Sequence, residues 1–134
     1  LAKDTRSALK VSEVGVNAIK DFKNVITPFP GGVVRSGSKV GSKYKSLIAS
    51  TNDSFCPSLQ GLVKDSKLNS KVGSVMEIVI DGVSEKDVFA AMKKSMRAMI
   101  KLGSSSGLIR ISAGNYGGKL GPYHFHLDKI CKEL

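Results

Sequence analysis

A short segment in the middle of the chain is apolar on both of its faces. Residues 74–80 read SVMEIVI, and Glu77 is the only charged residue among them. A strand that is hydrophobic on both faces must be covered on both sides, so the run predicts a central strand of a sheet. Because alternate side chains point to opposite faces, Glu77 should share a face with Val75 and Val79 and lie opposite Ile78.

The strongest helix signal follows this run directly. Ser84 is a capping residue, and Asp87 stands three positions later as a capping-box partner. Val83 is placed to pack on Val88 as a hydrophobic staple. Gly103 is the kind of residue that ends a helix. The predicted buried stripe has spacings of three and four and is interpreted as core rather than as a metal site: Val88, Met92, Met96 and Met99.

The other elements are predicted from weaker patterns. Apolar spacing predicts an amphipathic helix over 6–25, ended by the prolines and glycines that follow. Four segments are predicted as strands, the first two forming a hairpin around 37–43: 33–36, 46–51, 108–112 and 123–127. Residues 52–70 show no clear period and are predicted as a loop with one helical turn.

This order of elements predicts one α+β domain over residues 1–134. Both helices should cover one face of a mainly antiparallel sheet. A ferredoxin-like split β-α-β-β-α-β lobe needs one further strand before the first helix, and that strand is missing from the predicted elements.

The charge balance narrows the class of partner. The 134 residues contain 21 Lys and Arg against 11 Asp and Glu, a formal net charge of +10. Such a field favours an anion, which leaves nucleic acid, a phosphate-bearing cofactor and an acidic protein as alternatives.

No run of about 18 apolar residues predicts a membrane span. Cys56 and Cys131 lack metal-ligand spacing and are predicted to be reduced thiols. Because the chain opens with Leu1 directly before a helical pattern, we expect it to be the later part of a longer protein.

A loop rich in glycine and lysine is the first candidate for chemistry. Gly31 and Gly32 can turn backbone N–H groups toward an anion, and Arg35, Lys39 and Lys43 add positive charge. The loop lacks the GxxxxGK[ST] pattern of a phosphate-binding P-loop. A solvated hairpin loop therefore stays open as the alternative.

The second candidate is the segment 114–122, in which four glycines occur within eight residues. Gly117, Gly118 and Lys119 lie at its centre. Such glycine density indicates close backbone contact or positive φ angles, because glycine is costly to order. The contact would be with a ligand or with another chain, and the alternative is a plain connector between strands.

Glu77 is the third candidate. A carboxylate within an apolar strand needs a cation or hydrogen-bond donors, or must be held in its neutral form, and a group of the latter kind suits general acid/base catalysis. A salt-bridged glutamate at an edge or interface is the alternative. His124 and His126 share one face of a predicted strand, but no third ligand completes a metal site.

Three stretches together resemble a known protein family. Residues 25–60 read VITPFPGGVVRSGSKVGSKYKSLIASTNDSFCPSLQ, residues 75–96 read VMEIVIDGVSEKDVFAAMKKSM, and residues 109–127 read IRISAGNYGGKLGPYHFHL. In this order they resemble the C-terminal lobe of formylmethanofuran:tetrahydromethanopterin formyltransferase. The resemblance implies a cytoplasmic one-carbon enzyme of methanogenic and related archaea and some methylotrophic bacteria. Such an enzyme moves a formyl group from the methanofuran amine to N5 of tetrahydromethanopterin in a ternary complex, without a metal or prosthetic group.

The resemblance also implies an architecture and a set of roles. The family's subunit has two similar split β-α-β-β-α-β lobes and forms dimers and tetramers, and a Gly-rich strand precedes the helix matched by residues 8–25. Its active-site glutamate lies in the strand matched by VMEIVI, which assigns general acid/base and positioning roles to Glu77. Both coenzymes are polyanionic, so the basic residues of the two loops would bind them: Arg35, Lys39, Lys43 and Lys119. From chemistry alone, N–H groups of Gly31-Gly32 and Gly117-Gly118 would stabilise an oxyanion or hold carboxylate tails.

Two departures from the family shape the expectations. The family's subunit is about twice as long as this chain, and many archaeal members have an acidic surface. We therefore expect little or no formyl transfer by the isolated chain, which needs its first lobe or forms a homo-oligomer. Two other function classes stay open, with nucleic acid the less favoured partner: a basic α+β RNA-binding module, which lacks the aromatic pattern of RNA-recognition strands, and a non-catalytic assembly lobe.

Overall fold

The computed structural model describes residues 1–37, 40–46, 51–113 and 121–134. Its helices are α1 (Thr5–Asn17), α2 (Glu85–Lys101) and α3 (Leu127–Cys131). Its strands are β1 (Val25–Ile26), β2 (Val34–Arg35), β3 (Met76–Glu77) and β4 (Asp81–Gly82). Short 3₁₀ turns connect them: η1 (Pro30–Gly32), η2 (Asp53–Phe55), η3 (Pro57–Leu59) and η4 (Ser104–Ser106). These elements confirm an α+β fold with small antiparallel sheets.

Helix α2 forms as its signals predict. The Ser84 side chain accepts a hydrogen bond from the Asp87 N–H at 3.2 Å, and its hydroxyl donates to the Asp87 carboxylate at 2.7 Å. Gly103 follows the helix with φ +70°, a left-handed angle that glycine adopts without strain. The staple is wrong, because Val83 is 81% exposed. Met96 and Met99 are buried, as the core interpretation requires.

Helix α1 is shorter than predicted. It begins at Thr5, with the Asp4 carboxylate accepting a hydrogen bond from the Ser7 N–H at 2.7 Å, and it ends at Asn17 instead of residue 25. The reason is tertiary, because Val25–Ile26 forms the strand β1 and pairs antiparallel with β4. Pairing with a distant strand overrides the local helical spacing.

The two antiparallel strand pairs have unequal connections. In one pair Val34 faces Glu77, and in the other Ile26 faces Asp81. Seven residues, 27–33, separate β1 from β2, whereas three residues, 78–80, separate β3 from β4. The longer connection contains η1, Pro30–Gly32, which forms a bulge between β1 and β2. The predicted central strand is thus interrupted, and only its residues 76–77 are assigned to β3.

The first residues of the chain lie between two distant segments. Ala2 forms antiparallel bridges with Ser74 on one side and with Leu108 on the other. The Ala2 N–H donates to the Ser74 carbonyl oxygen at 2.9 Å, and the Ile109 N–H donates to the Leu1 carbonyl oxygen at 3.0 Å. Ala2 is 1% exposed, so these backbone groups are paired within the protein rather than with water.

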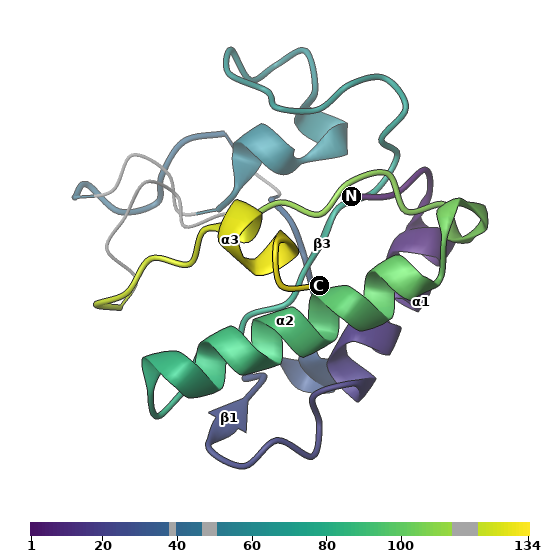
Figure 1. The fold of residues 1–134 in the computed structure, drawn as a ribbon. Helices are drawn as coiled ribbons and strands as arrows, with labels where there is room; N and C mark the ends of the chain where they lie inside the picture. The colour runs from purple at the N-terminus through teal and green to yellow at the C-terminus, as the bar shows by residue number, and fades with distance from the viewer. Residues whose placement is uncertain (38–39, 47–50, 114–120) are drawn as a thin grey trace.

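Two layers pack on either side of the chain around β3 (Figure 1). Helices α1 and α2 pack together, and residues of both belong to a core cluster against which Ile78 packs. On the other side Val75 packs with Phe55 and Val72, which belong to the segment 51–73. Val75 and Ile78 therefore point to opposite faces, as the alternation of side chains predicts.

Several predicted strands differ in the structure. Residues 108–112 contribute a single bridge, at Leu108, rather than a strand. Residues 123–126 are irregular, and Leu127 begins helix α3, whose Ile130 is fully buried in the core shared with α2. In place of the predicted hairpin, β2 pairs with β3, and residues 47–50 of the second predicted arm lie outside the described residues.

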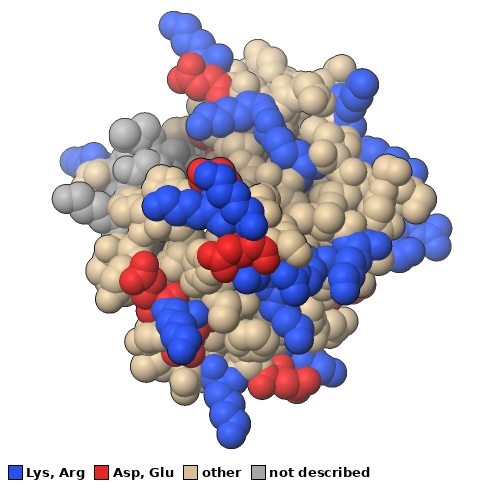
Figure 2. All heavy atoms as spheres, viewed as in Figure 1, with Lys and Arg blue, Asp and Glu red and all other residues tan. Residues whose placement is uncertain are grey.

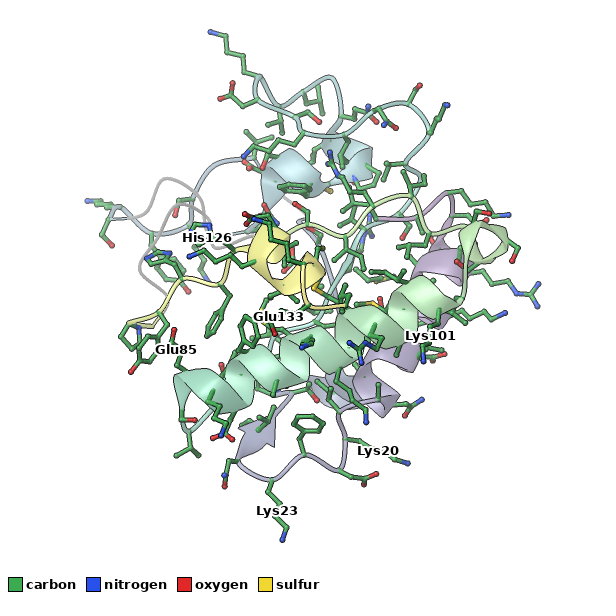
Figure 3. The ribbon with its side chains drawn as sticks, viewed as in Figure 1. Lys20, Lys23, Glu85, Lys101, His126 and Glu133 are labelled. Carbon is green, nitrogen blue, oxygen red and sulfur yellow. The ribbon has the colours of Figure 1, made fainter. Side chains whose placement is uncertain are left out.

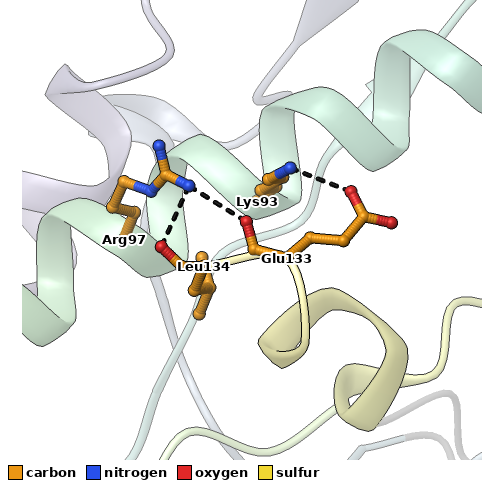
Figure 4. Close-up of polar contacts among 4 residues, drawn as sticks. All are labelled: Lys93, Arg97, Glu133 and Leu134. Carbon is orange, nitrogen blue, oxygen red and sulfur yellow. Dashed lines mark hydrogen bonds and ion pairs between the residues drawn. The ribbon is translucent and has the colours of Figure 1, made fainter.

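The segment after α3 is tied to α2 by charged groups (Figure 4). The Lys93 ammonium contacts the Glu133 carboxylate at 2.8 Å. The Arg97 guanidinium donates to the carbonyl oxygens of Glu133 at 3.0 Å and Leu134 at 3.1 Å. In the part of the chain that the structure describes, no helix is long and apolar enough to cross a membrane.

Candidate functional site

Glu77 lies on β3, on the face covered by the segment 51–73 rather than by the helices. It is half-buried and faces Val34 of β2 across the ladder. The Asn52 side-chain amide donates a hydrogen bond to Glu77 Oε1 at 3.3 Å. A hydrogen-bond donor, one of the three alternatives that the sequence left open for this carboxylate, is therefore present.

The backbone holds Asn52 in place just before η2. Its carbonyl oxygen accepts a hydrogen bond from the Phe55 N–H at 3.0 Å. Gly37 lies against this carbonyl: a Cβ at Gly37 would be 2.7 Å from the Asn52 oxygen and 2.6 Å from Cys56 Cβ. Gly37 also has φ +57°. The close approach of the end of β2 to residues 52–56 thus requires glycine.

The second half of the glycine and lysine loop returns to the same place. The Gly41 N–H donates to Asp53 Oδ2 at 3.0 Å, which joins the loop to the residue beside Asn52. Lys43 follows two residues later and is exposed. Gly41 and Glu77 therefore contact the adjacent residues Asp53 and Asn52. In the sequence, 36 positions separate Gly41 from Glu77, and 34 separate Lys43 from Glu77.

Positive charge surrounds this face. Arg35, the last residue of β2, donates to the Ser58 hydroxyl at 3.4 Å. Lys67 Nζ and the Arg110 guanidinium carbon each lie 5.9 Å from the centre of the Phe55 ring. Figure 2 shows that Lys and Arg are also frequent on the helical side of the molecule. Lys20, Lys23 and Lys101 are examples of exposed cations there (Figure 3).

Gly31 and Gly32 have different surroundings within η1. Gly31 is exposed with φ +68°, and no heavy atom lies within 4 Å of where its Cβ would be. Gly32 is buried with φ +76°, and a Cβ there would be 2.6 Å from Val16 Cγ1 of helix α1. Its N–H donates to the Phe29 carbonyl oxygen at 2.7 Å. Gly32 therefore packs the bulge on α1, while the backbone of Gly31 is the more approachable of the two.

The remaining candidates are divided between the surface and undescribed segments. Lys39, Gly117, Gly118 and Lys119 lie outside the described residues. His126 is exposed and precedes helix α3 (Figure 3). In residues 1–37, 40–46, 51–113 and 121–134, no group of three His, Cys, Asp or Glu side chains is placed to hold a metal ion. Cys56 and Cys131 are free thiols, as predicted.

Residues 1–130 match the protein family described as "FTR, proximal lobe". The chain belongs to this family. Curated members from Methylobacillus flagellatus and Methanocaldococcus jannaschii are named formylmethanofuran--tetrahydromethanopterin formyltransferase. They are 58% identical over 130 residues and 50% identical over 133 residues, and each alignment covers 97% of this chain.

Solved structures agree with this assignment. The formyltransferase/hydrolase complex from Methylorubrum extorquens, crystallised with methylofuran, matches 97% of this chain with a TM-score of 0.83 and 44% identity. The formylmethanofuran:tetrahydromethanopterin formyltransferase from Methanosarcina barkeri matches 96% with a TM-score of 0.81 and 43% identity. The chain spans 43% of the length of the two curated relatives and 42% and 43% of these two solved chains.

Within this member of the FTR proximal-lobe family, Asn52 is the polar partner that sequence reasoning missed. The run Thr51-Asn52-Asp53-Ser54 is rich in residues that favour turns and caps, which was a signal for the 3₁₀ turn η2 but not for a contact with β3. A half-buried carboxylate held by an amide can accept or give a proton at a bound substrate.

Proposed function

We propose that this chain forms the lobe of a formyltransferase that carries the acid/base group for transfer of a formyl group from formylmethanofuran to N5 of tetrahydromethanopterin. The observation that carries the proposal is the half-buried Glu77 carboxylate on β3, held by the Asn52 amide, in a chain that resembles formyltransferases over nearly its whole length. No prosthetic group takes part in the proposed reaction, and both coenzymes are substrates.

The strand pairings support a ferredoxin-like split β-α-β-β-α-β lobe formed by residues 1–134. Reading across the bridges and ladders gives the order Leu108, Ala2, β3, β2, with every neighbouring pair antiparallel. Residue 74 leads directly into β3, so Ala2 lies beside the same path of chain. In this proposal residues 1–3 occupy the position of the first strand, and both long helices connect strands that lie two places apart in the sheet.

The proposed chemistry needs one proton acceptor close to the reacting carbon. The N5 amine of the pterin attacks the formyl carbonyl, a C–N bond forms, and Glu77 takes the proton that N5 loses. The tetrahedral intermediate then collapses, the bond to the methanofuran nitrogen breaks, and Glu77 returns the proton to that leaving amine. The Gly31 N–H and, in the undescribed segment, the N–H groups of Gly117 and Gly118 are proposed to stabilise the oxyanion or hold carboxylate tails.

Cations around the site are proposed to attract the two anionic coenzymes. Arg35 and Lys43 are exposed on segments that meet η2 and η3, and Lys39 and Lys119 extend the same role into undescribed segments. Attraction by a basic rim chiefly raises the association rate. We further propose that the lobe works in the cytoplasm, within a homo-oligomer or together with a first lobe such as those of its longer relatives.

Formyl transfer measured on a chimera tests this proposal. In the chimera, residues 1–130 replace the matched segment of the Methylobacillus flagellatus formyltransferase. We expect the unmodified chimera to be active and the isolated chain to have little or no activity. Glu77→Gln should lower kcat by about 100-fold or more if Glu77 transfers protons, because general acid/base catalysis contributes that much.

Two outcomes would count against the proposal. An inactive but folded chimera would remove the formyltransferase assignment of this chain. A loss below threefold on Glu77→Gln would leave Glu77 as a structural residue. Glu85→Gln is the matched control, because Glu85 is an exposed glutamate at the start of α2 and should leave kcat unchanged (Figure 3).

A further inference from the structure

We propose that Asn52 is a positioning residue that sets the orientation of the Glu77 carboxylate for proton transfer. This inference rests on the proposed function, since it assigns Asn52 a role through Glu77. Its observation is the hydrogen bond from the Asn52 amide nitrogen to Glu77 Oε1 at 3.3 Å, which crosses from the segment 51–73 to β3.

Two hydrogen bonds from its own segment hold Asn52 in place. The Phe55 N–H donates to the Asn52 carbonyl oxygen at 3.0 Å, and the Ser54 hydroxyl donates to Asn52 Oδ1 at 3.5 Å. The side-chain oxygen of Asn52 thus accepts a bond from Ser54, which leaves the NH₂ end to face Glu77. Phe55, the last residue of η2, is buried and packs with Val75, two residues before Glu77.

Gly37 allows the two partners to approach. Its missing Cβ would lie 2.7 Å from the Asn52 carbonyl oxygen, closer than such atoms can come without a shift. Ser36, the residue before it, donates its N–H to the Val75 carbonyl oxygen at 3.1 Å, so this end of β2 is held beside β3. The strand pair on one side and the Gly37 contact on the other therefore fix the distance between Asn52 and Glu77.

Orientation matters because proton transfer needs the carboxylate at a defined place relative to the substrate. The Glu77 carboxylate can rotate about the Cβ–Cγ and Cγ–Cδ bonds of its side chain. A reacting group misplaced by about 1 Å can reduce a rate by about 100-fold. A donor on one carboxylate oxygen limits this rotation. The Asn52 amide thus helps to turn the position of β3 into a defined position of Glu77 Oε1.

Asn52 variants of the chimera test this role by kinetics. Asn52→Ala removes the donor, and Asn52→Asp keeps the shape but places a carboxylate oxygen where the donor was. We expect kcat to fall about 10-fold to 100-fold in both, with KM for each coenzyme changed less than threefold, because substrate binding is not what Asn52 supports. Asn69→Ala is the matched control, since Asn69 lies in the same segment and its side-chain oxygen accepts a hydrogen bond from the nearby Lys71 N–H.

A double-mutant cycle separates positioning from general support of the fold. In a Glu77→Ala background, Asn52→Ala should lower kcat less than twofold further, because the group that it orients is gone. The same additional loss in both backgrounds would overturn the inference, as would full kcat in Asn52→Asp with Glu77→Gln still impaired. Loss of activity in neither Glu77→Gln nor Asn52→Ala would instead remove the proposed function itself.

Discussion

Replacement of Gly32 by alanine tests the packing of the η1 bulge on helix α1. Gly32 is buried and has φ +76°, and a Cβ would be 2.6 Å and 2.8 Å from the two γ-carbons of Val16. The same Cβ would be 3.0 Å from Thr27 Oγ1. Val16 is β-branched and rigid in a helix, so it has no free rotamer to move into.

The expected cost has two parts. A left-handed angle at a residue with a Cβ costs about 1 to 2 kcal/mol. Forcing an extra carbon into a packed contact costs about 1 to 3 kcal/mol more. Gly32→Ala should therefore lower the free energy of unfolding by about 2 to 5 kcal/mol. Gly31→Ala is the matched control, because Gly31 has φ +68° but nothing within 4 Å of its Cβ position, so only the first cost applies.

Urea unfolding followed by circular dichroism at 222 nm measures these differences without a tryptophan, which the chain lacks. The double variant Val16→Ala with Gly32→Ala should show a favourable coupling of about 1 to 3 kcal/mol, because the clashing γ-carbons are removed. Equal losses for Gly31→Ala and Gly32→Ala, with no coupling to Val16, would refute the reasoning.

Two further predictions concern the helices. The Ser7 backbone N–H and the Ser7 hydroxyl hold the pKa of the Asp4 carboxyl below its ordinary value of 3.8. Asp4 should therefore stabilise α1 above its unfolded pKa and lose this effect as the pH falls through the lowered folded value, which carboxyl NMR titration and a comparison with Asp4→Asn would check. Ser95→Ala should stabilise the protein by about 0.5 to 2 kcal/mol, because the buried Ser95 hydroxyl has no hydrogen-bond partner among the described residues and alanine favours helices. A loss of stability in urea unfolding would contradict this.

Helix α2 could be predicted from the sequence because its capping residues, its apolar spacing and its final glycine agreed, although the Val83 staple was wrong. Ser84 and Asp87 cap the start of the helix, and Gly103 follows its end with a positive φ angle. Spacing alone predicts that Met96 and Met99 are buried. Helix α1 was predicted to be too long because its local pattern and its tertiary contacts disagree. Its last predicted turns, up to Val25, lose to pairing with β4, a partner more than fifty residues away.

The end of the chain shows how one pattern serves two structures. Phe125 and Leu127 alternate with histidines, which predicts a strand. Leu127 and Ile130 are also three positions apart, as in a helix, and burial of Ile130 against α2 decides for α3. Packing against a distant element made this choice, and no property of residues 123–127 alone contains it.

In the candidate site, too, one residue could be found from local sequence and the other depends on tertiary contacts. Glu77 could be singled out as a candidate because a charge in an apolar run conflicts with its surroundings, which is visible in the sequence. Asn52 could not, because nothing in its own segment specifies β3 as its neighbour. The contact between them exists only once β2, Gly37 and η2 have met.

The position of Ala2 between Ser74 and Leu108 has a consequence for the order of folding. The backbone nitrogen of Leu1 donates to the carbonyl oxygen of Arg110, 109 residues along the chain. Closing so large a loop is entropically costly and slow, whereas α1 and α2 form from local contacts. During synthesis at about 5 to 20 residues per second, Leu108, which pairs with the other side of Ala2, emerges roughly 5 to 20 s after it. Until then the backbone groups of residues 1–3 that pair with residues 107–110 have no partner there, and this is the interval in which a nascent chain of this family would be most open to pairing with the wrong segment.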